Sequence, residues 1–362
     1  MLFAFLTSTP MDLLRGSGTF AGIQGLAEGL RGLGHTVRVL TPNFPCFHYT
    51  TRRLIYNRRL AARVDALRPD IVIGFDMDGY RYARRSPRAP FVASIKGVIA
   101  DELTNESGAT RWMMTVQAKR EKINVLHADL VLATSQYSAA KIAEHYGIEK
   151  FKVHIVPELI DLEGWRARFA AHPAAAPERF TVLSVCRFYP RKRLDDLIAA
   201  AALLPGTEVR IAGNGPEAKR LHRLGPHISW LGDVTAGQLA EEYNRCHVFC
   251  LPSVQEGFGI VYLEAMAAGK PIVAARAAAV PEVVRDGVEG ILVEPRDPAA
   301  LAAALARLRD DAGLRNTLSR NATARAADFQ REKVCRRFLD AVEKLRRSPP
   351  PCSRQATTAR HQ

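Results

Sequence analysis

Short runs rich in β-branched or apolar residues alternate along most of the chain with longer segments in which apolar positions repeat at helical spacing. Six runs lie in the first half, at residues 2–6, 36–40, 71–75, 91–95, 130–133 and 153–156. Six more follow, at 181–185, 209–212, 228–231, 248–251, 271–274 and 290–293. Continuous apolar runs separated by helices are typical of parallel sheets buried on both faces. The pattern therefore predicts an α/β fold with two doubly wound, Rossmann-like domains.

The segment 157–179 separates the two sets of strands. Its Pro, Ala and charged residues carry little strand signal, and 362 residues are enough for two domains. We expect a first domain over 1–160, a linker over 161–179 and a second domain over 180–330, with a ligand cleft between the domains. Residues 331–347 are expected to form a C-terminal helix that packs back on the first domain, and the polar, Pro-containing tail 348–362 to be disordered.

Composition narrows the class of protein. The chain is 47% hydrophobic and 24% charged, which is typical of a globular protein. It contains no apolar run of about 18 residues, and its apolar start lacks the basic residues of a secretory signal. The six cysteines form no CxxC pair, so we expect neither a zinc site nor a disulfide framework. We therefore expect a cytoplasmic protein.

The formal net charge of +14 favours a polyanionic partner, such as nucleic acid, an anionic membrane or a phosphorylated substrate. A general preference for arginine gives the same total, however, and no nucleic-acid recognition module is visible. We expect no nucleic-acid partner. The arginines between Arg52 and Arg88 lie largely along one predicted helix, where they suit either the inner face of an anionic membrane or a solvated helix face.

Two cations follow the strand at 181–185. Arg187 stands just past the carboxyl end of that strand, and Lys192 precedes the next helix. Open parallel sheets bind ligands at this edge, and two cations there suit a pyrophosphate. The alternative is a solvated basic loop, since Arg191 and Arg193 share the segment.

The most specific pattern is VFCLPSVQEGFGIVYLEAMAAGKP at 248–271. Glu256 opens a loop, Gly257, Phe258 and Gly259 lead into a helix, and Glu264 lies one turn into that helix. Glycines at a helix N-terminus expose backbone N–H groups to an anion, and the helix dipole adds positive potential. Two carboxylates in fixed places can also accept hydrogen bonds from the hydroxyls of two sugars. The pattern indicates a site for a sugar linked to phosphate.

The order of these motifs resembles the C-terminal half of glycosyltransferase family 4, whose members are retaining enzymes of the two-domain GT-B fold. The matching segments are VLSVCRFYPRKRLDDLIAA, IAGNGPE with Gly213 and Gly215, WLGDV, the Glu256-to-Glu264 block, AAGKPIVAA and PEVVRDGVEGILVEPRDPAAL. One departure is Ala277-Ala278-Ala279, where family members often carry two adjacent glycines.

The resemblance implies a role for each matching residue. Arg187 and Lys192 would hold the donor diphosphate, Glu264 would bind the nucleotide ribose, and Glu256 would lie beside the transferred sugar. The Gly257–Gly259 loop and the Gly213 and Gly215 turn would contact the donor. The implied reaction is a metal-independent, cofactor-free transfer of a hexose-type sugar from a nucleotide diphosphate to a hydroxyl of a glycan, a lipid-linked acceptor or a small polyol. A UDP-sugar epimerase and a noncatalytic sugar-nucleotide-binding relative are the alternatives.

Gly16 and Gly18 lie between the first strand and a helix predicted to reach about residue 33. A dinucleotide fingerprint is not indicated, because there the glycines follow the strand directly and an acidic residue ends the second strand. The segment instead resembles the N-terminal glycine loop of family 4, which implies contact with the donor phosphates and the acceptor.

Three further residues of the first half are candidates for the acceptor side. Asp76-Met77-Asp78 follows the strand at 71–75, and we expect Asp78 either to contact the acceptor or to lie in a solvated turn. Lys96 stands where many family members carry a His near the reacting sugar, and Glu102 lies just beyond it. We expect both at the acceptor side, with no metal site.

Overall fold

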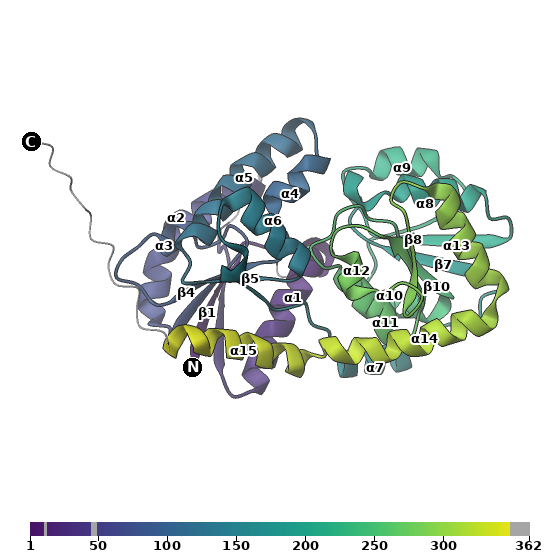
Figure 1. The fold of residues 1–362 in the computed structure, drawn as a ribbon. Helices are drawn as coiled ribbons and strands as arrows, with labels where there is room; N and C mark the ends of the chain where they lie inside the picture. The colour runs from purple at the N-terminus through teal and green to yellow at the C-terminus, as the bar shows by residue number, and fades with distance from the viewer. Residues whose placement is uncertain (11–12, 45–48, 348–362) are drawn as a thin grey trace, which may run out of the picture.

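Each half of the chain forms a domain around one six-stranded parallel sheet, and the two domains lie side by side (Figure 1). The computed structural model describes residues 1–10, 13–44 and 49–347, so the expected disordered tail lies outside the described residues. The predicted α/β fold with two doubly wound sheets is confirmed, and all twelve predicted strands are present, with bounds within two residues of those expected.

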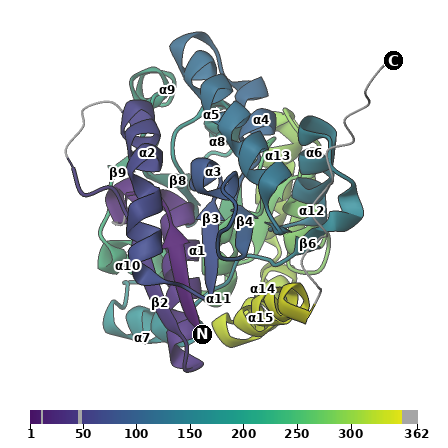
Figure 2. The same cartoon turned by 90° about the vertical axis from the view of Figure 1, so that its left-hand side faces the viewer.

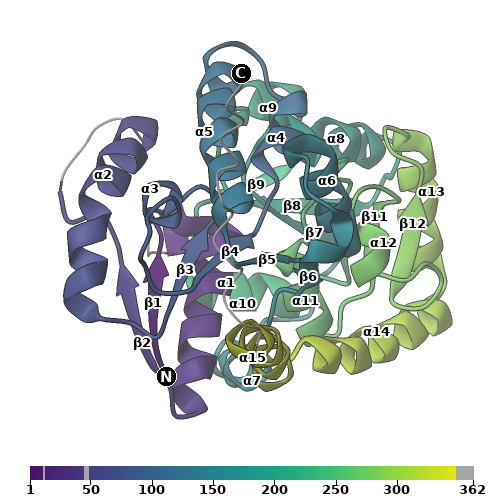
Figure 3. The same ribbon diagram turned by 60° about the vertical axis from the view of Figure 1, so that its left-hand side comes forward.

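In the first sheet the chain adds its second strand on one side of the first strand and all later strands on the other side. Its strands are β1 (Leu2–Leu6), β2 (Thr36–Leu40), β3 (Ile71–Phe75), β4 (Phe91–Ile95), β5 (Leu130–Ala133) and β6 (Val153–Ile155). Their order is β2-β1-β3-β4-β5-β6, which runs from left to right in Figure 3. The carboxyl ends of β1 and β3 therefore flank the switch point, where open α/β sheets bind ligands.

Both faces of the first sheet are buried, which is why its strands read as continuous apolar runs. Along β1, Phe3 and Phe5 belong to the core on one face, and Ala4 and Leu6 to the core on the other. One face is covered by α1 (Leu13–Gly32) and α15 (Arg331–Arg347). The other carries α2 (Tyr49–Leu67), α3 (Tyr80–Ala83), α5 (Gly108–His127) and α6 (Gln136–Tyr146), and the short α4 (Ile99–Glu102) precedes α5.

The second sheet has the same kind of switch point. Its strands are β7 (Phe180–Val185), β8 (Thr207–Ala212), β9 (Ser229–Gly232), β10 (Val248–Leu251), β11 (Ile272–Ala275) and β12 (Gly290–Val293), in the order β12-β11-β10-β7-β8-β9. The switch lies between β7 and β10. The helices are α8 (Leu194–Ala202), α9 (Ala218–Leu224), α10 (Ala236–Arg245), α11 (Ile260–Ala267), α12 (Val280–Val283), α13 (Pro298–Asp310) and α14 (Ala312–Ala326).

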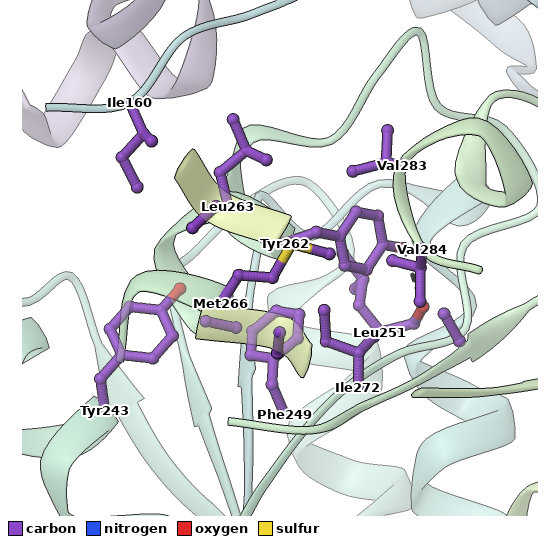
Figure 4. Packing of buried hydrophobic residues seen from close by; sticks show 14 of the residues in the cluster. Ile160, Tyr243, Phe249, Leu251, Tyr262, Leu263, Met266, Ile272, Val283 and Val284 are labelled. Carbon is purple, nitrogen blue, oxygen red and sulfur yellow. Dashed lines mark hydrogen bonds between the residues drawn. The ribbon is translucent and has the colours of Figure 1, made fainter. Parts of the chain in front are cut away.

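Helix α11 is anchored on the second sheet by its apolar side. Tyr262, Leu263 and Met266 are fully buried in one cluster with Phe249 and Leu251 of β10 (Figure 4). The Tyr262 hydroxyl also donates to the Leu251 carbonyl at 3.1 Å. This packing fixes the N-terminus of α11 at the edge of the sheet where β7 and β10 end.

The predicted linker is shorter than the sequence indicated. Helix α7 (Leu162–Ala171) occupies its first half and buries Leu162 and Trp165 in the core of the second domain. Leu162, Trp165 and Phe169 repeat at helical spacing, a pattern that the Pro- and Ala-rich composition of the segment concealed.

The chain returns to the first domain beside the point where it left. The Ile160 N–H donates to the Phe329 carbonyl at 2.9 Å, and the Arg331 N–H donates to the Ile160 carbonyl at 3.0 Å. Helix α15 then runs along the lower edge of the first domain in Figure 1 and is seen nearly end-on in Figure 2. It places Phe338 in the core with Phe3. The two chain crossings form a double connection between the domains.

Candidate functional site

Two adjacent cavities lie between the domains, where the carboxyl ends of the two sheets face each other. The inner cavity has a volume of about 200 Å³, and the outer cavity, which continues along the first domain, about 580 Å³. The cavities share Gly97, Glu102 and Arg191. The inner cavity is lined by many of the residues selected from sequence, namely Gly18, Lys96, Glu102, Arg187, Lys192, Glu256, Gly257, Phe258 and Gly259.

Lys192 and Glu256 form an ion pair in the inner cavity. The Lys192 Nζ lies 2.5 Å from Glu256 Oε1, and the two side chains are only 13% and 10% exposed. They come from the turn after β7 and the loop after β10, the two strands that flank the switch point. Arg187 lies at the same edge, is 37% exposed and is 3.8 Å from Asp233. Its loose pairing leaves the guanidinium available to an anionic ligand.

The loop from Gly257 to Gly259 brings the N-terminus of α11 to the cavity. Gly259 has a φ of +89°, which only glycine adopts readily. The first N–H groups of a helix have no carbonyl partner within their own helix, and they carry the positive end of its dipole. The Phe258 ring is buried against Phe329, with the ring centroids 5.4 Å apart, so it anchors the loop. The arrangement can bind an anion through the backbone.

Glu264 lies in α11 and accepts a hydrogen bond from the Tyr243 hydroxyl at 3.0 Å. Burial raises the pKa of Glu264 to about 7, and the hydrogen bond from Tyr243 and the charge of Arg168 oppose this shift. Its side chain does not line either of the two cavities, but Val261, one turn earlier on the same helix, lines the inner one. A ligand that extends along α11 from the inner cavity would reach it.

The selected glycines act through close contacts. A Cβ at Gly18 would lie 2.8 Å from Ile260 Cγ2, so this glycine lets α1 approach the start of α11. Gly16 and Gly18 lie inside α1 and not in a loop before it, because the helix begins at Leu13. Gly213 and Gly215 line neither cavity. A Cβ at Gly213 would collide with the carbonyl of Cys186, so the turn supports the segment that carries Arg187.

Lys96 and Glu102 are both held by ion pairs at the cavity wall. The Lys96 Nζ lies 3.0 Å from Glu158, and both side chains are 8% exposed. Glu102 lies 3.5 Å from Arg191, which comes from the second domain. Glu158 and Arg191 also line the inner cavity, although the sequence analysis gave neither a role. Arg191 stands next to Lys192 in the matching segment VLSVCRFYPRKRLDDLIAA, which is a sequence signal that could have selected it.

Asp78 is not exposed at the acceptor side. It is fully buried, where its carboxylate accepts hydrogen bonds from the Ser8 N–H and hydroxyl at 2.7 and 2.6 Å and from the Asn57 amide at 2.9 Å. Arg53 is 3.4 Å away. The expectation of a solvated or acceptor-facing Asp78 is therefore wrong, because the turn after β3 points this carboxylate inward. Asp76, two residues earlier, lines the outer cavity instead.

Three hydrogen bonds from the first domain converge on the carbonyl of Gly257. The hydroxyls of Thr134, Ser135 and Ser138 donate to it at 3.0, 2.8 and 3.1 Å. A further contact joins α12 to α6, because the Glu282 carboxylate accepts from the N–H groups of Gln136 and Tyr137, both at 2.7 Å. No local pattern in the sequence indicates these partners, which lie more than 110 residues apart.

The predicted arginine cluster is divided between buried and exposed positions. Arg53 is buried against Asp78, whereas Arg58, Arg59 and Arg84 are exposed. Among residues 1–10, 13–44 and 49–347, no helix is long and apolar enough to cross a membrane. Within the same ranges no group of three or more His, Cys, Asp or Glu side chains is placed to hold a metal ion.

Two family models match the chain in succession. The model described as Glycosyltransferase Family 4 matches residues 17–163, and the one described as Glycosyl transferases group 1 matches residues 166–325. Together they cover most of both domains, and they meet at the connection between them.

Curated relatives are about one third identical to this chain over the aligned residues. The D-inositol 3-phosphate glycosyltransferase of Salinispora tropica is 32% identical over 245 residues, which are 60% of this chain and 51% of that protein. The corresponding protein of Geodermatophilus obscurus is 34% identical over 233 residues, 58% of this chain and 51% of that protein. The chain spans about half the length of the curated relatives it matches.

Solved structures share the fold over nearly the whole chain. Sucrose-phosphate synthase from Thermosynechococcus elongatus gives a TM-score of 0.81 at 20% identity, covering 95% of this chain and 99% of that one. Anabaena HepE in complex with UDP-glucose gives 0.73 at 21% identity, covering 95% of this chain and 100% of that one. The likeness shows a common two-domain architecture, the GT-B fold.

Proposed function

Because this chain belongs to glycosyltransferase family 4 and has the GT-B fold, we propose that it transfers a hexose-type sugar from a nucleotide diphosphate to an acceptor hydroxyl with retention of configuration. One observation carries the proposal. Lys192, Glu256 and the N-terminus of α11 meet in one cavity at the switch point of the second sheet. A cation, a carboxylate and free backbone N–H groups together suit a phosphate joined to a polyhydroxylated ring.

In the proposed complex the donor diphosphate lies between Arg187, Lys192 and the start of α11. The transferred sugar lies beside Glu256, whose carboxylate accepts hydrogen bonds from its hydroxyls, and the nucleotide extends along α11 so that Glu264 binds the ribose. The 2.5 Å pairing of Lys192 with Glu256 supports this placement, because it keeps the cation at the point where phosphate and sugar join.

The proposed reaction breaks the bond between the anomeric carbon and the diphosphate oxygen, while the acceptor oxygen bonds to the same face of the sugar. The acceptor proton passes to the leaving phosphate. Negative charge develops on that phosphate, and preorganised cations and N–H groups stabilise such charge most effectively where water is excluded. Arg187, Lys192 and the α11 N-terminus supply this stabilisation, so we propose that the transfer needs no divalent metal and no cofactor.

The acceptor is proposed to enter through the outer cavity, where Lys96 and Glu102 mark its boundary with the donor. Met113 and Met114 give this cavity an apolar wall, and threonine hydroxyls and Asp76 give it polar groups. A glycan, a lipid-linked sugar or a small polyol fits that chemistry. If the acceptor is carried on an anionic membrane, the exposed arginines of the first domain would contact its head groups. We propose the cytoplasm as the place of action, in keeping with the free cysteines of the described residues.

The first test is nucleotide binding. The melting temperature of the whole chain would be measured with UDP, GDP and ADP, and a nucleotide present at 100 times its Kd should stabilise the fold by about 2.7 kcal/mol. UDP-glucose, GDP-mannose and ADP-glucose would then be incubated with the protein, and release of free nucleotide followed. We expect one nucleotide to stabilise the protein and its sugar conjugate to be turned over.

Two variants test the site. Lys192→Ala and Glu264→Ala should each lower donor turnover by about 100-fold, since each removes a group that contacts the donor. Lys219→Ala, an exposed lysine of α9 in the same domain, is the matched control and should match the wild type. Full turnover in the Lys192 variant would overturn the site assignment. Epimerisation of UDP-glucose without release of UDP would indicate the epimerase, and nucleotide binding without any turnover a noncatalytic relative.

A further inference from the structure

The carbonyl oxygen of Gly257 receives an unusual number of donors. Thr134, Ser135 and Ser138 are at most 2% exposed, and all three direct their hydroxyls at this one oxygen. A carbonyl oxygen has two lone pairs, so the three hydroxyls compete for it. The Ser135 hydroxyl also lies 3.0 Å from the Ser138 hydroxyl. When the other two hydroxyls donate to the carbonyl, the Ser135 hydroxyl can therefore donate to Ser138. The oxygen is fixed more firmly than a single hydrogen bond would allow.

These donors belong to the other domain. Thr134 follows β5 and Ser135 caps α6, both in the first domain, whereas Gly257 lies in the donor-site loop of the second. The two backbones are in direct contact, since a Cβ at Gly257 would lie 2.7 Å from the Lys96 carbonyl. The hydrogen bonds therefore exist only when the two domains are together as in this structure.

The orientation of this carbonyl determines that of the next N–H group. The peptide group is planar and trans, so the C=O of Gly257 and the N–H of Phe258 point in opposite directions. With the carbonyl held against α6, the Phe258 N–H is directed away from the first domain's β5–α6 corner. Glycine has access to backbone conformations closed to other residues, so this peptide could rotate when the domains separate.

We infer that Thr134, Ser135 and Ser138 are positioning residues, which on domain closure hold the Gly257–Phe258 peptide so that the Phe258 N–H is presented to the bound nucleotide sugar. The inference rests on the proposed function. It explains why three hydroxyls of the acceptor domain contact the Gly257–Gly259 loop. The Phe258 N–H is oriented toward the nucleotide sugar only when the two domains are closed. Turnover of the donor is thereby restricted to the state in which the acceptor domain is in place.

The test removes the hydroxyls with little change of shape. Thr134→Val and Ser138→Ala would be made singly and together, leaving Ser135 in place because its side chain caps α6. Donor turnover would be measured with the nucleotide sugar that the wild type uses, among UDP-glucose, GDP-mannose and ADP-glucose. We expect kcat to fall about 10-fold in each single variant and about 100-fold in the double variant, with KM and the Kd of the free nucleotide within a factor of two.

Two controls separate positioning from folding. Thr134→Ser keeps a hydroxyl and should restore kcat, and Thr317→Val removes a hydroxyl that donates to a carbonyl within α14, 3.0 Å away, and should change nothing. A double variant with wild-type kcat would overturn the inference, as would a parallel loss of kcat, nucleotide affinity and melting temperature. If the wild type turned over none of the three donors, the proposed function itself would fail, and that result is distinct from an active double variant.

Discussion

Asp76 carries a carboxylate whose two oxygens have different surroundings. Its Oδ1 accepts a hydrogen bond from the Lys96 N–H at 2.8 Å, whereas no hydrogen bond to Oδ2 is found among the described residues, and the residue lines the outer cavity. Its φ is +53°, a left-handed conformation that is uncommon for residues other than glycine, asparagine and aspartate. Such strained residues concentrate at functional sites. Asp76 therefore has the position that was predicted for Asp78, at the acceptor side of the cleft.

Burying the charged form of Asp76 costs free energy, so Asp76→Asn should change the stability of the protein in a pH-dependent way. Burial raises the pKa of Asp76 to about 6, against the charge of Arg53 and the Lys96 N–H, while Glu102 adds to the rise. Because the folded pKa exceeds the unfolded value, the wild type loses stability as pH rises from about 4 to 6. Asparagine tolerates the same left-handed backbone conformation, and its side-chain oxygen can accept the hydrogen bond from the Lys96 N–H. The free energy of unfolding of the variant, relative to that of the wild type, should therefore rise by on the order of 2 kcal/mol between pH 4 and pH 6.

Urea unfolding at pH 4, 5, 6 and 7 would measure this gain. All other acidic groups are the same in the two proteins, so their contributions to the pH dependence cancel in the comparison. Asp65→Asn removes a carboxylate that is 51% exposed and is the matched control for the change of one charge, and we expect the pH-dependent gain in stability for Asp76→Asn alone. A difference between Asp76→Asn and wild type that does not vary with pH would show that Asp76 is solvated in the folded protein.

At the scale of elements, the packing of α15 on α1 depends on one glycine. A Cβ at Gly29 would lie 2.4 Å from Cys335 Sγ and 2.9 Å from Arg331 Cγ. The arginine side chain can move, but Cys335 is fully buried. The two helices can thus approach closely only because α1 has no side chain at this position.

Gly29→Ala should destabilise the protein by about 1–3 kcal/mol through this overlap, although alanine favours the helix itself. The double variant Gly29→Ala, Cys335→Ala removes the colliding sulfur and should recover most of the loss. Gly32→Ala is the matched control on the same helix, because a Cβ there meets nothing within 4 Å. Free energies from urea unfolding would show a coupling of about 0.5–3 kcal/mol between positions 29 and 335. Additive effects would contradict the proposed contact.

The sequence predicts those elements whose structure depends mainly on the residues within one short segment. Most of the strands are largely apolar runs, because both faces of each sheet are covered, although β2 and β8 include Arg38 and Arg210. The Gly257–Gly259 loop is marked by its glycines. Helix α7 was missed, since its apolar positions are few and its neighbours resemble a linker. The distinction between Asp76 and Asp78 depends on which way one turn points its side chains, and periodicity does not determine this. Ala278 has a φ of +51°, a conformation that favours glycine, and it lies where the sequence has alanines in place of the two adjacent glycines that family members often carry.

At the scale of the whole molecule, the site is assembled from contacts that cross between the domains. Gln255 donates to Asp101 at 3.0 Å, and Arg191 lies 3.5 Å from both Glu102 and Glu106. None of these pairs could be read from the sequence, since each joins segments that are distant along the chain. Closure of the cleft therefore depends on polar contacts, which can be broken and remade as substrates enter and leave.

Glu282 provides the contact whose loss should weaken closure most directly. Its carboxylate accepts from the first two N–H groups of α6, where it also opposes the positive end of the helix dipole. Removing such a cap costs about 1–2 kcal/mol, so in Glu282→Ala the closed state should be about 5- to 30-fold less favoured relative to the open one. Small-angle scattering at saturating nucleotide should show a larger radius of gyration than for the wild type. Glu144→Ala, which removes an exposed carboxylate of α6 paired with Lys141 of the same helix, is the control and should leave the radius unchanged. An equally compact Glu282 variant with wild-type nucleotide affinity would show that this cap does not contribute to closure.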